Sequence, residues 1–352
     1  MRSTGQRLGL PALVAAAVVV LLVATDVLSS AMAPDVRDER PNPVVSVARL
    51  SQDVARTAAD ATDVSRGCSR PSTLPLGRTS EVRLPVDGIE RVFRLHVPSS
   101  YSPSRPTPLL VAFHGRHRSG ALLEADSGLS GLPVLVAYPE GVRNQVGRLD
   151  WQIGPQATRG VDDVAMTRAL IARVQQGFCV DRDRVYALGH SNGGGMAVTV
   201  ACALPDQVAA VVAISGAFYD RAAGCVGSPI SLLELHGTAD RVIPYQGGRL
   251  PEEFGRTTLP RISRWIRNQA IVNGCETTPA QRRLGRGVVQ VTWRECTTGH
   301  PVSLVRIGGG LHRVPSTRVL GGTPLAVLTW RFLRTQHLPA DVRAAQVADA
   351  PR

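Results

Sequence analysis

The chain contains no lysine, so its positive charge is carried by arginine alone. The formal net charge of the 352 residues is +12. Nucleic-acid-binding domains gather basic residues into a patch or stripe. Here the arginines are scattered, with no basic run and no interleaved aromatic residues. We therefore expect no nucleic-acid partner, although the charge is compatible with a weak preference for acidic surfaces or anionic substrates.

Aromatic residues make up only 4% of the chain, and no two cysteines have the C-x-x-C spacing of a zinc site. The missing spacing argues against bound zinc, and we expect no metal. The low aromatic content bears on adsorption instead. With so few aromatic residues and no added carbohydrate-binding or polymer-binding module expected, we do not expect strong adsorption to a solid polymer.

An apolar run over residues 8–25 follows two arginines, a pattern typical of export. Ala31-Met32-Ala33 has the small residues of a cleavage site, but Pro34 directly after it disfavours cleavage. The run also approaches the ~20 residues of a membrane span. Two interpretations stay open: residues 1–33 are a signal peptide and the protein is secreted, or residues 8–25 tether it to a membrane in the cell envelope.

Composition divides the rest of the chain into three parts. Residues 34–67 are rich in Ala, Asp, Arg and Ser and are interpreted as a flexible linker. Residues 68–338 are expected to form one domain, and residues 339–352 a disordered tail.

All six cysteines lie beyond the leader, and an even number in an exported chain indicates disulfide bonds. Cys275 is expected to pair with Cys296, because the two bracket a hairpin-like segment. Cys202 is expected to pair with Cys225, because the two bracket one strand. The remaining pair, Cys68 with Cys179, would tie the start of the domain to its middle.

Short apolar runs alternate with helical patterns along the domain. The alternation predicts an α/β fold, with a mostly parallel central sheet and helices on both faces. Strands are expected at 81–85, 91–98, 108–113, 134–138, 184–188, 208–215, 230–236, 288–293 and 302–307. Helices are expected after Asp162, at 194–203, at 260–272 and at 322–338.

The segment Gly189-His190-Ser191-Asn192-Gly193 has the G-x-S-x-G pattern of a nucleophile elbow. It lies between an expected strand and an expected helix, the context that this turn requires. Ser191 is therefore the candidate nucleophile. The His190 side chain is expected to point away from that of Ser191.

A serine nucleophile needs a base and a group that orients the base, and in this fold both follow later strands in the order Ser, Asp, His. Asp240 follows the strand at 230–236 in a tight turn, and Asp220 is the competing candidate. His312 follows the last strand and three glycines. These positions predict a triad of Ser191, Asp240 and His312.

Two further sets of residues complete the expected site. The backbone N–H groups of Asn192 and Arg116 are expected to form the oxyanion hole, because one follows the nucleophile and the other follows an early strand. Trp151 and Tyr245 lie on loops at the same sheet edge and are candidates for the substrate pocket, with core packing as the alternative.

Several segments resemble the secreted polyhydroxybutyrate depolymerase and feruloyl esterase family of α/β-hydrolases. They are FHG (113–115), AYPEG (137–141), VDDVAMTRALI (161–171), CVDRDRVYALGHSNGGGMA (179–197), HGTAD..IPY (236–245) and the glycine-rich loop before His312. The resemblance implies an α/β-hydrolase fold and a secreted, cofactor-free serine esterase with the same triad. The family often has Trp two residues after the histidine, where this chain has Val314.

The sequence thus predicts an exported serine esterase acting on short-chain, hydroxyalkanoate, feruloyl or acetyl esters through an acyl-enzyme. Its substrate is a small-molecule or polymeric ester. Two alternatives stay open. One is a peptidase or cell-envelope acyltransferase on the same fold, and the other is a non-catalytic surface or adhesion protein.

Overall fold

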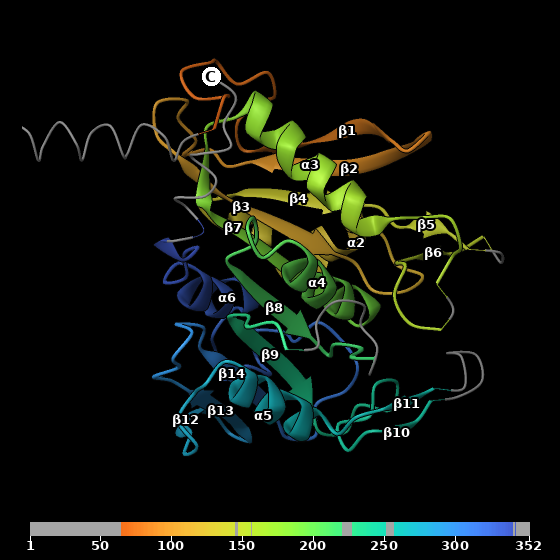
Figure 1. Cartoon of the computed structure of the whole chain (residues 1–352), viewed down its shortest axis with the longest axis vertical. Coiled ribbons are helices and arrows are strands. Elements are labelled where there is room, and N and C mark those ends of the chain that lie inside the picture. Colours follow the sequence, from red (N-terminus) through yellow and green to blue (C-terminus); the bar gives the residue numbers. More distant parts are fainter. Residues whose placement is uncertain are drawn as a thin grey trace, which may run out of the picture. The chain divides into compact units, whose positions relative to one another are not determined.

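A computed structural model describes residues 65–144, 147–155, 157–219, 227–250, 257–340 and 342 (Figure 1). The strands, in chain order, are β1 (Arg78–Val86), β2 (Ile89–Val97), β3 (Thr107–Phe113), β4 (Leu135–Pro139), β5 (Val142–Arg143), β6 (Leu149–Asp150), β7 (Val180–His190), β8 (Ala210–Ile214), β9 (Leu232–Gly237), β10 (Gly248–Arg249), β11 (Thr258–Leu259), β12 (Ala280–Gly285), β13 (Val288–Trp293) and β14 (Val302–Ile307). The helices are α2 (Gly120–Ser127), the 3₁₀ turn η1 (Leu129–Gly131), α3 (Asp163–Gly177), α4 (Asn192–Ala203), α5 (Ile262–Val272) and α6 (Leu325–Leu333).

Ten strands form one sheet in the order β1-β2-β4-β3-β7-β8-β9-β14-β13-β12. The six strands from β4 to β14 run parallel, while β1, β2, β13 and β12 pair antiparallel at the two edges. The inner strands β3, β4, β8 and β9 are buried along their whole length. Apolar runs of this kind are expected where helices cover both faces of a parallel sheet.

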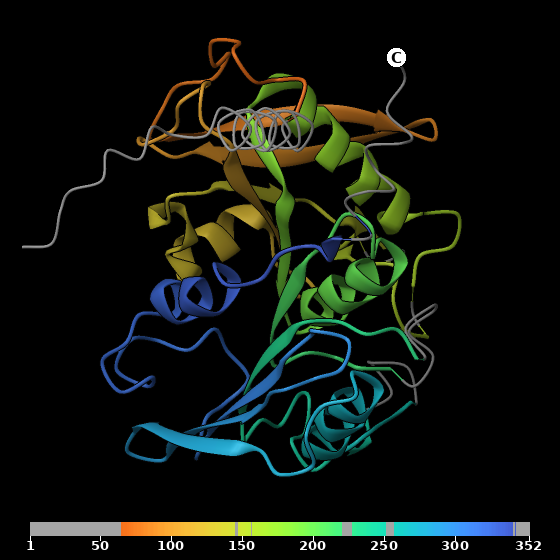
Figure 2. The same cartoon turned by 60° about the vertical axis from the view of Figure 1, so that its left-hand side comes forward.

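The helices cover opposite faces of the sheet (Figure 2). On one face α3, α4 and α5 pack on alternate strand residues such as Val111 and Ala187. On the other face α2 and α6 pack on the intervening residues, such as Leu110 and Leu188. The predicted mostly parallel sheet with helices on both faces is therefore confirmed.

The predicted elements at the centre of the sheet agree with the structure, and the differences lie at its margins. Helix α6 is shorter than predicted, because it begins only after Pro324 and ends at Leu333. Helix α2 and strand β12 are not predicted from the sequence. Most residues of β12 are exposed, so this strand has no apolar pattern to read.

The domain includes residues beyond both predicted boundaries. Ser65, which is assigned to the linker from the sequence, is buried and donates through Oγ to the carbonyl of Phe178. The amide of Gly67 donates to the carbonyl of Gln175. At the other end, Val342 packs against the core cluster of α6. Residues 1–64 and 343–352, with the predicted leader, lie outside the described residues. Within the part of the chain that is described, no helix is long and apolar enough to cross a membrane.

Two of the expected disulfides are present. Cys68 is bonded to Cys179, across a sequence separation of 111 residues, and Cys275 is bonded to Cys296, across 21 residues. Cys202 is also disulfide-bonded, and Cys225, its expected partner, lies outside the described residues.

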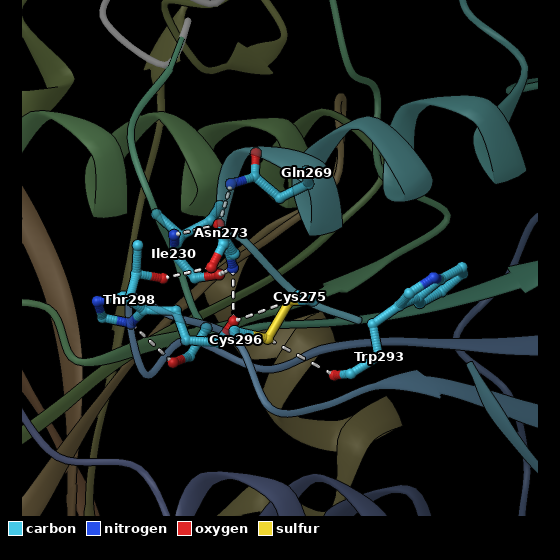
Figure 3. The surroundings of a disulfide bond; sticks show 9 residues. Ile230, Gln269, Asn273, Cys275, Trp293, Cys296 and Thr298 are labelled. Carbon is cyan, nitrogen blue, oxygen red and sulfur yellow. Dashed lines mark hydrogen bonds between the residues drawn. A yellow bond between two sulfur atoms is a disulfide. The ribbon is translucent and has the colours of Figure 1, made fainter. Parts of the chain in front are cut away.

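A buried hydrogen-bond cluster surrounds the Cys275–Cys296 bond (Figure 3). Asn273 donates through Nδ2 to the carbonyls of Ile230 and His300, at 2.7 and 2.6 Å. Its Oδ1 accepts from Gln269 Nε2 at 2.8 Å. Noncovalent contacts therefore hold this segment in place alongside the disulfide.

The two disulfides are predicted to differ in their contribution to stability. The chain-entropy account gives about 4.7 kcal/mol for a closed loop of about 100 residues and about 3 kcal/mol for one of about 15. Replacing Cys68 and Cys179 together by Ser should therefore lower the urea concentration at the midpoint of unfolding more than replacing Cys275 and Cys296 together by Ser. Urea unfolding of the two double variants under oxidising conditions measures this order, and the reverse order would contradict it.

Candidate active site

The nucleophile elbow joins the end of β7 to the start of α4. Ser191 has φ 57° and ψ −121°, in the left-handed half of the backbone map, where a non-glycine residue is strained. A Cβ on Gly189 would lie 1.9 Å from the carbonyl oxygen of Gly193. A Cβ on Gly193 would lie 2.3 Å from the carbonyl oxygens of Phe113 and His114. Both flanking glycines are therefore required by the close approach of backbones.

Ser191, His312 and Asp240 come together in one hydrogen-bonded chain. His312 Nδ1 lies 2.7 Å from Asp240 Oδ2, and His312 Nε2 lies 2.9 Å from Ser191 Oγ. A carboxylate only accepts, so Nδ1 carries the ring hydrogen and Nε2 is free to accept from the serine hydroxyl. Asp220, the competing candidate, lies outside the described residues.

Asp240 is held by its own turn after β9. Its Oδ1 accepts from the amides of Val242 and Ile243, each at 2.9 Å. Burial opposes ionisation, but the hydrogen bond and charge of His312, together with those two amides, hold the pKa of the carboxyl below its ordinary value. A carboxyl with a lowered pKa stabilises the fold above the unfolded-state pKa, and this stability is lost as pH falls through the folded-state pKa.

The loop after β3 brings Gly115 and Arg116 beside the nucleophile. A Cβ on Gly115 would lie 3.5 Å from Ser191 Cβ, which shows how closely this backbone passes. The Arg116 side chain is buried, and its Nε lies 2.9 Å from Asp150 Oδ2. Arg116 lines the same cavity as Ser191, and Asn192 begins α4 directly after it, while their role as oxyanion donors stays a prediction.

His114 braces this loop as a neutral imidazole. The amide of Gly141 donates to His114 Nε2 at 2.9 Å, so His114 Nδ1 carries the hydrogen and donates to the carbonyl of Gly115 at 2.8 Å. Burial lowers the pKa of His114 to about 4. A neutral ring suits this place, because a protonated Nε2 could not accept from the amide of Gly141.

A cavity of about 220 Å³ opens beside Ser191 and His312. Leu123 and Val314 give it apolar walls, and Arg118 and Arg313 give it charged ones. Arg118 is paired with Asp126. The cavity is therefore small and mixed in polarity.

Neither predicted pocket aromatic lines this cavity. Trp151 has no exposed surface, and its Nε1 donates to the carbonyl of His114 at 2.7 Å. Tyr245 is also buried, with its ring centroid 5.8 Å from that of His236. The pocket assignment is therefore wrong for both, and the alternative of core packing is correct. Trp151 thus contacts both the loop after β3 and the start of α4, because its amide also donates to Asn192 Oδ1.

The expectation for His190 is also wrong. Its side chain lines the cavity with Ser191 and His312, and its ring centroid lies 5.0 Å from that of His312. Burial and the neighbouring charges lower the pKa of His190 to about 3, so the ring is a neutral wall. The chain turns sharply at Ser191, with φ 57°, and His190 and Ser191 line the same cavity.

The sequence gives only weak signals for the supporting residues. His114 belongs to the FHG segment, and Asp150 adjoins Trp151, but neither has a spacing that indicates its role. Glu234, fully buried in β9, lies in an apolar run that predicts only a core strand. Each of them also has a partner from another segment, namely Gly141, Arg116 and Gly216 respectively, and these contacts follow only from the fold.

The parallel sheet, the strained serine at a strand-to-helix turn and the Ser191–His312–Asp240 chain define an α/β-hydrolase. Residues 88–284 match the model of the Esterase family, and the chain belongs to this family. It is 33% identical over 276 residues to feruloyl esterase C of Emericella nidulans, covering 76% of this chain and 90% of that protein. It is 29% identical over 254 residues to feruloyl esterase B of Piromyces equi, of whose length it covers 44%.

Solved structures support the fold. The acetyl xylan esterase from Aspergillus awamori aligns with a TM-score of 0.53 over 72% of this chain and 99% of that one, at 16% identity. The S-formylglutathione hydrolase from Agrobacterium tumefaciens aligns with a TM-score of 0.50 over 77% and 99%, also at 16% identity. At this level of identity the likeness concerns the architecture.

The elbow predicts a sharp contrast between two glycine substitutions. Gly193→Ala places a methyl group against the carbonyls of Phe113 and His114, so it should destabilise the fold by about 1–3 kcal/mol and displace Ser191. Gly131→Ala is the control, because a Cβ there meets nothing within 4 Å. Thermal unfolding and labelling of Ser191 by a fluorophosphonate measure both effects. Normal labelling of the Gly193 variant would show that the elbow tolerates the methyl group.

Proposed function

We propose that this protein is an exported serine esterase that hydrolyses small carboxylic esters through a covalent acyl-enzyme. The observation that carries the proposal is the hydrogen-bonded chain from Ser191 Oγ through His312 to Asp240, opening into a cavity. A serine hydroxyl is a poor nucleophile unless a base lies within hydrogen-bond reach. His312 Nε2 is at that distance and faces the hydroxyl with its lone pair.

The reaction follows from the proton positions. Ser191 Oγ attacks the ester carbonyl carbon while His312 Nε2 takes the hydroxyl proton, giving a tetrahedral oxyanion and an imidazolium. The imidazolium returns the proton to the leaving alcohol as the C–O bond breaks. Water then repeats both steps on the acyl-enzyme, releasing the acid and restoring the Ser191 hydroxyl. Asp240 keeps the His312 tautomer and stabilises the imidazolium.

The amides of Arg116 and Asn192 are the proposed donors to the oxyanion. Both residues flank Ser191. Asn192 lies at the start of α4, where the backbone N–H groups point out of the end of the helix. Each such donor typically contributes about 2.7–4 kcal/mol to stabilising the transition state. The contacts of His114, Trp151 and Asp150 support this loop in position before substrate arrives.

The substrates that we propose are feruloyl and acetyl esters, together with short hydroxyalkanoate esters. Relatives named as feruloyl esterases support the first group. A cavity of about 220 Å³ with arginine in its walls suits compact polar esters. The disulfides support an extracellular location, since such bonds persist in oxidising compartments.

Loss of the nucleophile should abolish hydrolysis of p-nitrophenyl acetate. Ser191→Ala should lower kcat on the order of 10⁶-fold, to the background rate. Ser316→Ala is the matched control, because Ser316 is an exposed serine on the His312 loop and should retain activity. Residual activity of the Ser191 variant, or an inactive wild type, would refute the esterase mechanism.

Asp240→Asn should lower kcat on the order of 10⁴-fold with little change in KM, because the amide favours the wrong tautomer of His312. The variant should still fold, since the amide oxygen can accept from Val242 and Ile243. Steady-state kinetics and circular dichroism test the two parts together. An active Asp240 variant would assign the acid to another residue.

Methyl ferulate, acetylated sugars and hydroxybutyrate oligomers separate the proposed substrates. Turnover of at least one with kcat/KM well above that for a matched amide is expected. Preferential transfer of the acyl group to an added sugar would instead identify an acyltransferase, and faster cleavage of the amide a peptidase.

A further inference from the structure

Two ionisable side chains on β9 are fully buried and take no part in the proposed chemistry. Glu234 and His236 are two residues apart on the same face of the strand, and neither side chain has exposed area. Burying charged groups in a central strand is strongly unfavourable unless they are paired and hydrogen-bonded. Their presence there requires a structural or functional reason.

The hydrogen bonds fix the protons of the pair. His236 Nε2 lies 2.9 Å from the carbonyl oxygen of Ile243, which only accepts, so Nε2 carries a hydrogen. His236 Nδ1 lies 2.7 Å from Glu234 Oε1. The same oxygen accepts from the amide of Gly216 at 3.1 Å. Burial raises the pKa of Glu234, while the hydrogen bonds from His236 and Gly216 oppose that rise, and, against burial, the hydrogen bond and charge of Glu234 raise the pKa of His236. These contacts favour a carboxylate beside a charged ring. His236 is then an imidazolium that donates from both nitrogens.

One end of the pair reaches the triad acid. Ile243, whose carbonyl accepts from His236, donates its amide to Asp240 Oδ1 at 2.9 Å. His236 Nε2 also lies 3.6 Å from Asp240 Oδ2, the oxygen that accepts from His312. The His236 ring thus holds the turn that holds Asp240, and it places positive charge beside the carboxylate.

The other end reaches the segment beside the nucleophile. Gly216 follows β8, and the next amide, that of Ala217, donates to the carbonyl of Ser191 at 3.1 Å. A Cβ on Gly194, near the start of α4, would lie 3.0 Å from Gly216 Cα. The Glu234 carboxylate therefore anchors the backbone on which the elbow rests.

We propose that Glu234 and His236 form a buried ion pair that positions Asp240 for its hydrogen bond with His312 and ties the Asp240 turn to the elbow. The triad acid and the nucleophile come from different strands, and this pair is the polar link between them. Its role in turnover rests on the proposed esterase function, whereas its protons and its effect on the His312–Asp240 bond are measurable without turnover.

Other ionisable or charged groups face the pair from the surrounding elements. Asp240 and Tyr245 lie on the turn after β9, His312 on the loop after β14 and His190 at the end of β7. Arg306 is the register partner of His236 on β14, and its side chain is exposed. Among these, Asp240 is the group closest in contact with His236.

Glu234→Gln tests the pair with little change of shape. The amide oxygen can still accept from Gly216 and the amide nitrogen can donate to His236 Nδ1, which leaves the ring neutral. Both charges of the pair are lost, and the positive one is the one beside Asp240, so the acidic limb of the kcat/KM–pH profile should move to higher pH. We expect kcat to fall on the order of tenfold to a hundredfold, with KM little changed.

Asp163→Asn is the matched control. Asp163 is equally buried and pairs with Arg91 at 2.6 Å, but it contacts no triad residue. This variant should lower the unfolding temperature without moving the acidic limb. If Glu234→Gln behaves in the same way, the pair is only structural and the proposal is overturned.

Nuclear magnetic resonance of protein with ¹⁵N-labelled histidine gives a readout independent of catalysis. In the wild type at neutral pH both nitrogens of His236 should be protonated, and in Glu234→Gln only one. The low-field proton resonance of His312 Nδ1 should shift in Glu234→Gln and stay unchanged in Asp163→Asn. A singly protonated His236 in the wild type overturns the ion pair. An inactive wild type with these shifts would remove only the esterase proposal.

The unfolding temperature of a double variant tests the ion pair even if one of the single variants folds poorly. His236→Gln leaves Glu234 as an unpaired buried carboxylate, which is strongly destabilising. Adding Glu234→Gln removes that charge, so the double variant should unfold at a higher temperature than His236→Gln alone. Additive losses would contradict an ion pair.

Discussion

The left-handed backbone of Ser191 is the constraint on which the rest of the site depends. A non-glycine residue in that conformation costs about 1–3 kcal/mol and persists only where its surroundings hold it. Here the amide of Ser191 donates to Ile214, and its carbonyl accepts from Ala217 and Gly194. Strands β7 and β8 and helix α4 are therefore fixed relative to one another at this residue.

That constraint also determines how closely the loop after β3 can approach. Gly193 passes against the carbonyls of Phe113 and His114, and Gly115 passes against the side chain of Ser191. The start of α4 and the end of β3 are therefore in contact through backbone atoms. As a result, the position of the amides after β3 relative to Ser191 is set by the backbone and not by a side-chain conformation. The site lies beyond the carboxyl ends of parallel strands, where this fold generally places function.

Buried polar groups hold the two halves of the site. Beside Ser191, the loop after β3 is braced by His114, Trp151 and the Arg116–Asp150 pair. On the acid side, Glu234 and His236 brace the other. Each buried group has a desolvation cost and is stabilised only in one arrangement of its partners. Such networks favour rigidity, which suits a site that must keep its atoms in place before substrate binds.

The sequence was informative wherever a pattern reflects burial or backbone geometry. Alternating and continuous apolar runs predicted the inner strands, and the turn at Asp87-Gly88, with φ 48° and 76°, joins the hairpin that alternation predicted. Exposed β12 and short α2 carry no such pattern. Trp151 and Tyr245 show a different limit, because a loop aromatic near the site can turn into the core or outward. That direction depends on the partners that the folded chain supplies, here His114 for Trp151 and His236 for Tyr245.

The contrast between backbone geometry and side-chain direction also distinguishes the triad residues from the residues that line the cavity. Strand ends and buried hydrogen bonds hold the atoms of the triad, so their arrangement changes little when surface residues change. The cavity walls at Arg118, Leu123, Arg313 and Val314 are instead side chains on surface loops and on one short helix. We expect substitution at these positions to alter the shape and charge of the cavity more than the positions of Ser191 and His312. We therefore expect substrate preference to depend on these cavity residues, among them Val314, where the resembling family often has Trp.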